Sequence, residues 1–204
     1  MDSSINDWLV SLAAKTPTPG GGAVAALTTA IAAAQLGMVA IYTTGSKWQD
    51  REKRMQELVT ETAEIRAEAL ALMQADADAF TQVGTAYQLP KDTDDERTVR
   101  TALIQQALIA AANPPSRVVL LATRIIDIAF ELAEKGNPNV ISDVAVVASV
   151  ACAGLKSAIV NIEINELSIT DPITKENLRA IVQKTATVTQ KADDIIKNVR
   201  KQLQ

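Results

Sequence analysis

The fold is decided by Thr16–Ser46, TPTPGGGAVAALTTAIAAAQLGMVAIYTTGS, which contains no charged residue. The stretch is long enough to cross a bilayer, but Thr, Gln and Gly interrupt it and much of the rest is alanine, which is only marginally apolar. A helix that is uncharged on every side belongs in a protein core, or in a core that continues into an oligomer interface. We therefore expect a buried helix over about Ala23–Thr44 in a soluble protein, with no membrane span.

The rest of the chain also repeats its apolar residues at helical spacing, and no strand signal is strong. The predicted class is an all-α, multi-helix bundle of about seven helices that forms one domain over residues 1–204. Capping and breaking residues delimit the helices. Besides the buried helix, we expect helices around Ile5–Leu12, from about Gln49 to Tyr87, from Asp94 (capped by Thr93 and Glu96) to a break at Asn113-Pro114-Pro115, from Ser116 to Lys135 with Gly136 as C-cap, from about Val140 to Leu167, and from Pro172 (capped by Asp171) to the C-terminus.

Composition excludes several classes of function. The 204 residues include no histidine and a single cysteine, Cys152, so neither a Ser-His-Asp or Cys-His nucleophile system nor a zinc site of His and Cys ligands is possible. With 20 basic and 24 acidic residues and few aromatics, the chain has no basic surface for nucleic acid. An intramolecular disulfide is impossible, and the acidic start from Met1 to Asp7 is unlike a signal peptide, so we expect a cytoplasmic protein.

The loop before the buried helix is the first candidate for ligand binding. It contains Pro19, Gly20, Gly21 and Gly22. Successive glycines let a ligand approach the backbone closely, and the helix N-terminus that follows offers free N–H groups to an anion or a partly charged oxygen. The alternative is a tight interhelical turn with no ligand.

Two aspartates and two asparagines are the other candidates. Asp76 shares a helix face with Phe80 at i, i+4, and a carboxylate beside an apolar ring is suited to proton transfer because burial raises its pKa. Asp143 lies near the start of an apolar helix on the same azimuth as Asn161, with Asn165 40° further on, which predicts a polar seam. Such a seam binds a heteroaromatic ligand or serves hydrogen bonds between helices, and a first-turn aspartate also complements the helix dipole.

Taken in order, these motifs resemble the formiminotransferase-cyclodeaminase family, in particular its cyclodeaminase domain and the stand-alone bacterial methenyltetrahydrofolate cyclohydrolases. The resembling motifs span most of the chain. They are Pro17–Gly22, Asp76–Phe80, Leu89-Pro90-Lys91 with Thr93, Glu96 and Arg100, Gly136–Asn139, Ser142-Asp143, and Asn161–Asn165.

The resemblance implies an all-α homodimer that binds tetrahydrofolate, with no cofactor beyond this substrate carrier and no metal. It also implies one of two reactions. A cyclohydrolase adds water to 5,10-methenyl-tetrahydrofolate and yields 10-formyl-tetrahydrofolate, whereas a cyclodeaminase closes 5-formimidoyl-tetrahydrofolate to the methenyl form and releases ammonia. Because the chain is too short to hold a formiminotransferase domain as well, we favour the cyclohydrolase. A non-catalytic helical interaction module is the alternative from another class.

On this hypothesis folate binds in a cleft, within one chain or at the dimer interface, that is lined by Gly20–Gly22 and the helix that bears Asp143. Asp143 and Asp76 are the candidates for catalysis, with Asp143 pairing with the pterin or acting on the one-carbon unit. Asn161 and Asn165 would orient the pterin. Lys91 and Arg100 would meet the anionic glutamate tail.

Overall fold

The structure, a computed structural model, describes residues 4–203 as seven α-helices and two short 3-10 helices, without a strand. Residues 1–3 and 204, which hold part of the acidic start and the last residue of the expected final helix, lie outside this described part. The α-helices are α1 (Ile5–Leu12), α2 (Gly21–Ile41), α3 (Glu52–Tyr87), α4 (Asp94–Ala111), α5 (Asn113–Lys135), α6 (Ile141–Ser168) and α7 (Pro172–Gln202), and the 3-10 helices are η1 (Ser46–Trp48) and η2 (Pro138–Val140). The predicted all-α bundle is confirmed.

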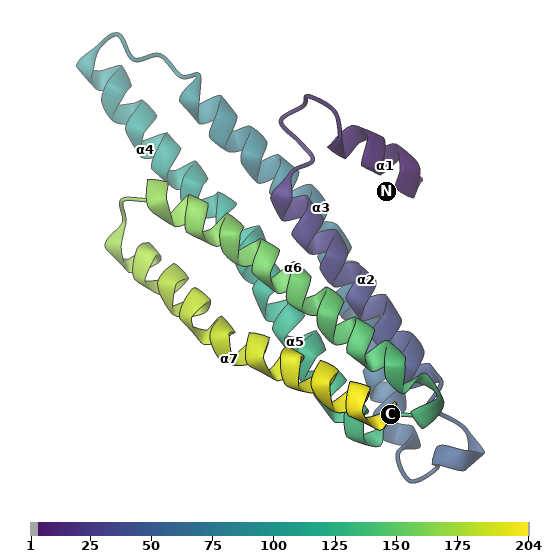
Figure 1. The fold of residues 1–204 in the computed structure, drawn as a ribbon. Helices are drawn as coiled ribbons and strands as arrows, with labels where there is room; N and C mark the ends of the chain where they lie inside the picture. The colour runs from purple at the N-terminus through teal and green to yellow at the C-terminus, as the bar shows by residue number, and fades with distance from the viewer. Residues whose placement is uncertain (1–3, 204) are drawn as a thin grey trace.

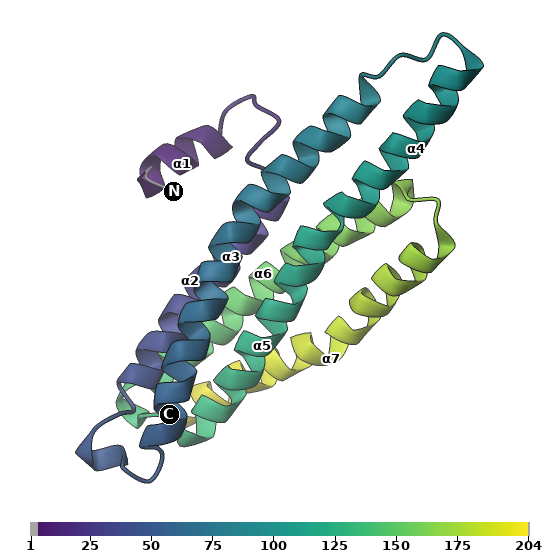
Figure 2. The same ribbon diagram turned by 180° about the vertical axis from the view of Figure 1, so that it is seen from behind.

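The long helices run side by side along one axis (Figure 1). Helices α2 and α6 pack against each other, α3 and α5 pack against α2, and α5 and α7 pack against α6. The ends of α3 and α4 extend beyond the other helices as a hairpin, which Figure 2 shows from behind. Helix α1 buries none of its residues and projects away from the bundle near the start of α2.

Small residues bring α2 close to its neighbours. Most of its buried positions are alanine. Gly154 of α6 lies so close to Thr29 that a Cβ on the glycine would be 2.5 Å from the threonine Oγ1. The uncharged stretch is thus the buried helix that its composition predicts, although α2 begins at Gly21, two residues earlier than expected.

The predicted end of one helix before Pro114 and Pro115 is confirmed, because α4 ends at Ala111 and only Ala112 separates it from α5. The predicted start of the next helix at Ser116 is wrong, since α5 begins at Asn113 and both prolines lie in its first turn. The first turn of a helix tolerates proline because its N–H groups need no partner within the helix. Helix α3 begins later than predicted, at Glu52 instead of about Gln49, because η1 precedes it.

The predicted caps are confirmed. Thr93 accepts a hydrogen bond from the Glu96 N–H at 3.2 Å, and the Glu96 carboxylate accepts one from the Thr93 N–H at 2.9 Å. Asp171 caps α7 through the Thr174 N–H at 2.7 Å. Gly136 is the C-cap of α5, but its φ of −74° is not left-handed. A glycine fits there because a Cβ would be 2.5 Å from the Leu132 carbonyl oxygen.

By length and composition, α2 and the segment from Pro138 to Ser168 are each apolar enough to cross a membrane. About half of each is buried against other helices of the bundle, as expected for core helices.

Candidate functional site

A cleft opens where α2 begins, between the α2 N-terminus and helices α3, α4 and α6. It has a volume of about 340 Å³, within the range of pockets that hold small organic ligands. Its walls combine the glycine loop with a carboxylate, two amides and apolar side chains. They are formed by Pro17, Thr18, Gly20, Gly21, Gly22, Asp76, Phe80, Val83, Tyr87, Leu108, Ala111, Asn161, Ile164, Asn165 and Ser168.

The carboxylate of Asp76 lies directly against the first turn of α2. A Cβ built on Gly22 would be 2.0 Å from Asp76 Oδ1 and 2.6 Å from Oδ2, so a larger residue at Gly22 requires the carboxylate to move. The Ala23 backbone N–H points at this carboxylate closely enough to lower its pKa. Glycine at this position therefore lets α3 present its aspartate to the amino end of α2.

The environment of Asp76 favours its protonated form. Burial raises the pKa of the carboxyl above its ordinary value of 3.8, and the N–H of Ala23 opposes this rise without cancelling it. Raising the pKa of a carboxyl towards neutrality makes it a better general acid and base at physiological pH. The pKa of Asp76 is therefore raised, as its position beside an apolar ring predicts.

The start of α2 supplies hydrogen-bond donors to the cleft. Gly20, the N-cap, has no side chain to accept from the first N–H groups, and the first hydrogen bond within the helix is donated by Val24. The N–H groups of Gly21 and Gly22 are therefore available to a ligand at the positive end of the helix dipole. Binding of a ligand to these backbone groups stays a prediction.

The two asparagines of α6 supply acceptors. Asn161 Nδ2 donates to the Ser157 carbonyl oxygen at 2.8 Å, and Asn165 Nδ2 donates to the Ala111 carbonyl oxygen at 3.2 Å. Each amide group is thus fixed through its nitrogen, which leaves its carbonyl oxygen to accept from a ligand. Asn161 also lies within 3.3 Å of the Cβ position of Gly21.

Sequence reasoning missed most of the apolar wall. Phe80, Val83 and Tyr87 follow Asp76 at i+4, i+7 and i+11 on one face of α3, and all line the cleft. Phe80 is 52% exposed and Tyr87 is 50% exposed, which is unusual for aromatic rings and makes both available to stack on a planar ligand. Continuing the helical spacing from Asp76 and Phe80 along α3 would have identified Val83 and Tyr87.

Asp143 does not line the cleft of its own chain, so the predicted polar seam along α6 is wrong. The azimuth of Asp143 agrees with that of Asn161, but 18 residues of helix separate them by about 27 Å along the axis. Asp143 is half-buried between α6 and α2 and accepts a hydrogen bond from Gln35 Nε2 at 3.0 Å.

The predicted basic contacts and Pro19 also lie outside the lining. Lys91 is exposed in the loop at the tip of the α3–α4 hairpin. Arg100 reaches the cleft only through Tyr87, whose carbonyl oxygen accepts from Arg100 Nη2 at 2.9 Å and whose ring lies 5.7 Å from the guanidinium. Pro19 is half-buried between the lining residues Thr18 and Gly20.

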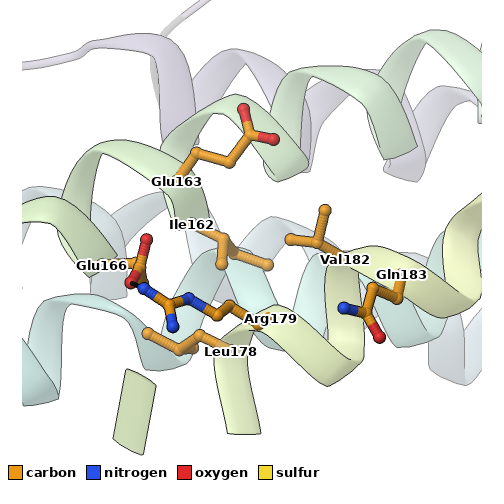
Figure 3. A pocket seen from close by; sticks show the side chains of 7 residues that line it. All are labelled: Ile162, Glu163, Glu166, Leu178, Arg179, Val182 and Gln183. Atoms are coloured by element: carbon orange, nitrogen blue, oxygen red, sulfur yellow. Dashed lines mark hydrogen bonds and ion pairs between the residues drawn. The ribbon is translucent and has the colours of Figure 1, made fainter. Parts of the chain in front are cut away.

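A second hollow of about 250 Å³ lies between α6 and α7 (Figure 3). Two of its charged side chains are paired with each other, because Glu166 accepts from Arg179 at 2.8 Å, and Glu166 also lies 3.6 Å from Lys175. None of the site residues expected from the sequence lines it. Across residues 4–203, no three acidic or cysteine side chains are grouped closely enough to hold a metal ion.

Comparison with known proteins shows the family of the chain. The sequence model described as formiminotransferase-cyclodeaminase matches residues 4–184. The chain belongs to the formiminotransferase-cyclodeaminase family. Within this family it is 38% identical over 171 residues to the methenyltetrahydrofolate cyclohydrolase of Methylorubrum extorquens, an alignment that covers 83% of this chain and 82% of that protein.

Two further relatives are named for the cyclodeaminase. The rat formimidoyltransferase-cyclodeaminase is 33% identical over 180 residues, which are 88% of this chain but only 33% of the rat protein. The crystal structure of formiminotetrahydrofolate cyclodeaminase from Thermotoga maritima superimposes with a TM-score of 0.84 at 29% identity, covering 98% of this chain and 95% of that one. The fold is therefore the cyclodeaminase fold, and the chain is a member of an enzyme family.

The structure separates the family motifs into two groups. Pro17–Gly22, Asp76–Phe80 and Asn161–Asn165 meet at the cleft, although they are far apart in the sequence. Ser142-Asp143 and Leu89-Pro90-Lys91 lie elsewhere on the same chain.

Proposed function

We propose that this chain is a methenyltetrahydrofolate cyclohydrolase, which adds water to 5,10-methenyl-tetrahydrofolate and yields 10-formyl-tetrahydrofolate. The relative from Methylorubrum extorquens bears this name and aligns over more than four fifths of both chains, which supports the proposal. The observation that carries it is the half-buried carboxylate of Asp76, which lies against Gly22 in the first turn of α2 and has a raised pKa. Such a group can take a proton from water and return it to a nitrogen without any histidine.

The cleft matches the chemistry of this substrate. The methenyl carbon bridges two nitrogens and carries a delocalised positive charge, which the Asp76 carboxylate attracts. The pterin ring is planar and presents N–H donors, which suit the carbonyl oxygens of Asn161 and Asn165 and the exposed rings of Phe80 and Tyr87. The N–H groups of Gly21 and Gly22 suit an oxygen on which negative charge develops.

The reaction takes two steps on this arrangement. First, Asp76 accepts a proton from a water molecule as the water oxygen bonds to the methenyl carbon, which becomes tetrahedral and neutral. Then protonated Asp76 gives its proton to the folate nitrogen N5, the bond between that nitrogen and the carbon breaks, and the carbon hydroxyl loses its proton to solvent as the formyl group forms. The overall balance is one water consumed and one proton released, and Asp76 returns to its carboxylate form.

Cyclodeamination is the second candidate, because the Thermotoga maritima structure with this fold carries the name formiminotetrahydrofolate cyclodeaminase. There the folate nitrogen N10 attacks the formimidoyl carbon, and the proton on N10 passes to the formimidoyl nitrogen. Protonated Asp76 gives a second proton to this nitrogen as its bond to the carbon breaks, so that ammonia leaves and the methenyl cation forms. Both reactions pass through a tetrahedral carbon between two folate nitrogens, so one cleft suits either.

Several finer features belong to the same proposal. We expect a cytoplasmic homodimer with no membrane or nucleic-acid partner and no cofactor beyond the folate itself. Arg100, which holds the lining residue Tyr87, and the exposed Lys91 are the nearest candidates to meet an anionic glutamate tail. The expected single domain over residues 1–204 stays a part of this proposal.

Absorbance of the methenyl chromophore tests the proposal. Purified chain is offered each substrate separately, and the chromophore disappears in hydrolysis but appears in cyclodeamination. Asp76→Asn keeps the shape of the side chain and removes its charge, so it should abolish either change. A non-catalytic helical module would change neither substrate, and saturating 5-formyl-tetrahydrofolate would not raise its melting temperature.

A further inference from the structure

The hairpin of α3 and α4 forms one wall of the cleft, and α6 forms the wall opposite. The hairpin contributes Phe80, Val83 and Tyr87 from α3 and Leu108 and Ala111 from α4. The outer ends of α3 and α4 extend beyond the other helices, so this part of the hairpin has support on fewer sides than the rest of the bundle (Figure 2). The width of the cleft therefore depends on what links the hairpin to α6.

Two amide side chains link α4 to the end of α6 and the turn that follows it. The inner link is the hydrogen bond from Asn165 Nδ2 to the Ala111 carbonyl oxygen at the end of α4. The outer link is Gln105, which lies about 9 Å further along α4 towards the tip of the hairpin. Gln105 Nε2 donates to the Ser168 carbonyl oxygen at 3.0 Å, and Gln105 Oε1 accepts from the Thr170 N–H at 2.7 Å and from the Thr170 hydroxyl at 2.9 Å.

Gln105 uses both ends of its amide group on this one turn. Ser168 is the last residue of α6 and lines the cleft. Ile169, which lies between the two partners of Gln105, is fully buried and so anchors the turn in the core. Hydrogen bonds at both the nitrogen and the oxygen of an amide fix its orientation as well as its distance. Gln105 therefore holds the hairpin to a turn that the core itself keeps in place.

We propose that Gln105 is a positioning residue, which sets the distance between the hairpin wall and α6 and so determines how tightly the cleft binds the planar ring of its substrate. Gln105 does not itself line the cleft and acts through the hairpin and Ser168. A wall that is held in place before the substrate arrives need not be ordered on binding, which strengthens binding. The inference rests on the proposed function for the identity of the substrate.

Loss of the Gln105 amide should weaken binding more than turnover. Asp76 lies at the inner part of the hairpin, where its contact with Gly22 fixes it against α2. Phe80 and Tyr87 lie about one and about three helical turns further out on α3. Gln105→Ala frees this outer wall and leaves the contact of Asp76 with Gly22 in place, so KM should rise about tenfold with little change in kcat.

Steady-state kinetics of three variants test this role. Gln105→Glu keeps an acceptor for both Thr170 donors but cannot donate to Ser168 at neutral pH, so its KM should lie between those of the wild type and Gln105→Ala. Gln106→Ala makes the same change at the adjacent, exposed glutamine of α4 and should keep the wild-type KM. An unchanged KM in Gln105→Ala, an equal rise in Gln106→Ala, or a loss that falls on kcat instead of KM would overturn the proposal.

Amide hydrogen exchange, followed by NMR without any substrate, tests the link itself. The Thr170 N–H donates to the Gln105 side chain, whereas the neighbouring Ile169 N–H donates to the Asn165 carbonyl oxygen. Gln105→Ala should speed exchange of the Thr170 N–H at least about tenfold and leave that of Ile169 unchanged, and Gln106→Ala should change neither. Unchanged exchange at Thr170 would overturn the link, whether or not folate is the substrate. Faster exchange in a chain whose wild type converts neither folate would support the link and overturn the proposed function instead.

Discussion

Gly22 and Asp76 occupy adjoining space: a carboxylate oxygen of Asp76 lies 2.0 Å from the position of a Cβ on Gly22. Because the aspartate comes from the middle of the bundle on α3 and the glycine from the first turn of α2, the contact fixes the start of one helix against the other. It also places the half-buried carboxylate of the cleft at a helix N-terminus, where its proton and the neighbouring N–H groups can serve one reacting carbon.

The three glycines of the loop should differ in their tolerance of alanine. Gly20→Ala has nothing within 4 Å of its new Cβ and should keep nearly full activity. Gly21→Ala crowds Asn161 at 3.3 Å and should mainly raise KM. Gly22→Ala must displace the Asp76 carboxylate, and a displacement of about 1 Å is expected to lower kcat by about 100-fold. Steady-state kinetics of the three variants check this order, and equal effects at all three positions would mean that the loop acts only as a turn.

Asp76→Asn should separate stability from activity. Because burial raises the pKa of the Asp76 carboxyl, the folded chain binds this proton more tightly than the unfolded chain. The free energy of unfolding from this group therefore falls as the pH rises from the ordinary value of 3.8 through the raised value, and stays lower above it. The amide does not titrate, so at neutral pH the variant should be at least as stable as the wild type while turnover is lost.

Urea unfolding of Asp76→Asn and the wild type between pH 3 and 8 measures this difference. The exposed Asp78, two residues further along α3, provides the control variant Asp78→Asn, which should keep wild-type turnover. An Asp76→Asn variant that is clearly less stable at neutral pH would show that the charge of Asp76 holds the fold together, and that lost activity says nothing about catalysis.

Asn161 should contribute to binding more than to turnover. Its amide nitrogen is held by the Ser157 carbonyl, so its oxygen faces the ligand in a fixed position. Removing one such hydrogen bond with Asn161→Ala is expected to cost about 1.4 kcal/mol, which is a tenfold rise in KM with little change in kcat. Asn198→Ala on the exposed side of α7 is the control and should leave both constants unchanged. An unchanged KM in Asn161→Ala would remove Asn161 from the binding site.

Alanine substitutions at two glycines should change the free energy of unfolding in opposite directions, because only one of the two lies where α2 packs closely on α6. Gly154→Ala brings a Cβ to 2.5 Å from Thr29 Oγ1 and should lower the free energy of unfolding by about 1–3 kcal/mol. Gly84→Ala in α3 meets nothing within 4 Å and should raise it by about 0.5–1 kcal/mol. Urea denaturation measures both, and a neutral Gly154→Ala would show that the helix contact is loose.

Most of the fold follows from the sequence, because helical periodicity and caps such as Thr93 and Asp171 act locally. The start of α5 was expected at Ser116 but lies at Asn113, because a proline can stand between helices or in the first turn of a helix, and the sequence alone does not decide between the two. Only part of the candidate site could be predicted from the sequence. The glycine loop, Asp76, Asn161 and Asn165 come together, but a shared azimuth does not bring Asp143 to Asn161, since position along the helix axis also counts.

The measurement that tests the central claim most directly is the methenyl absorbance of 5,10-methenyl-tetrahydrofolate with purified wild-type chain and with Asp76→Asn at equal concentration. The wild type should accelerate the loss of absorbance well above the rate in buffer, with 10-formyl-tetrahydrofolate as the product, and folded Asp76→Asn should not. Loss of absorbance at the buffer rate with a folded wild-type chain, or equal acceleration by both proteins, would contradict the account.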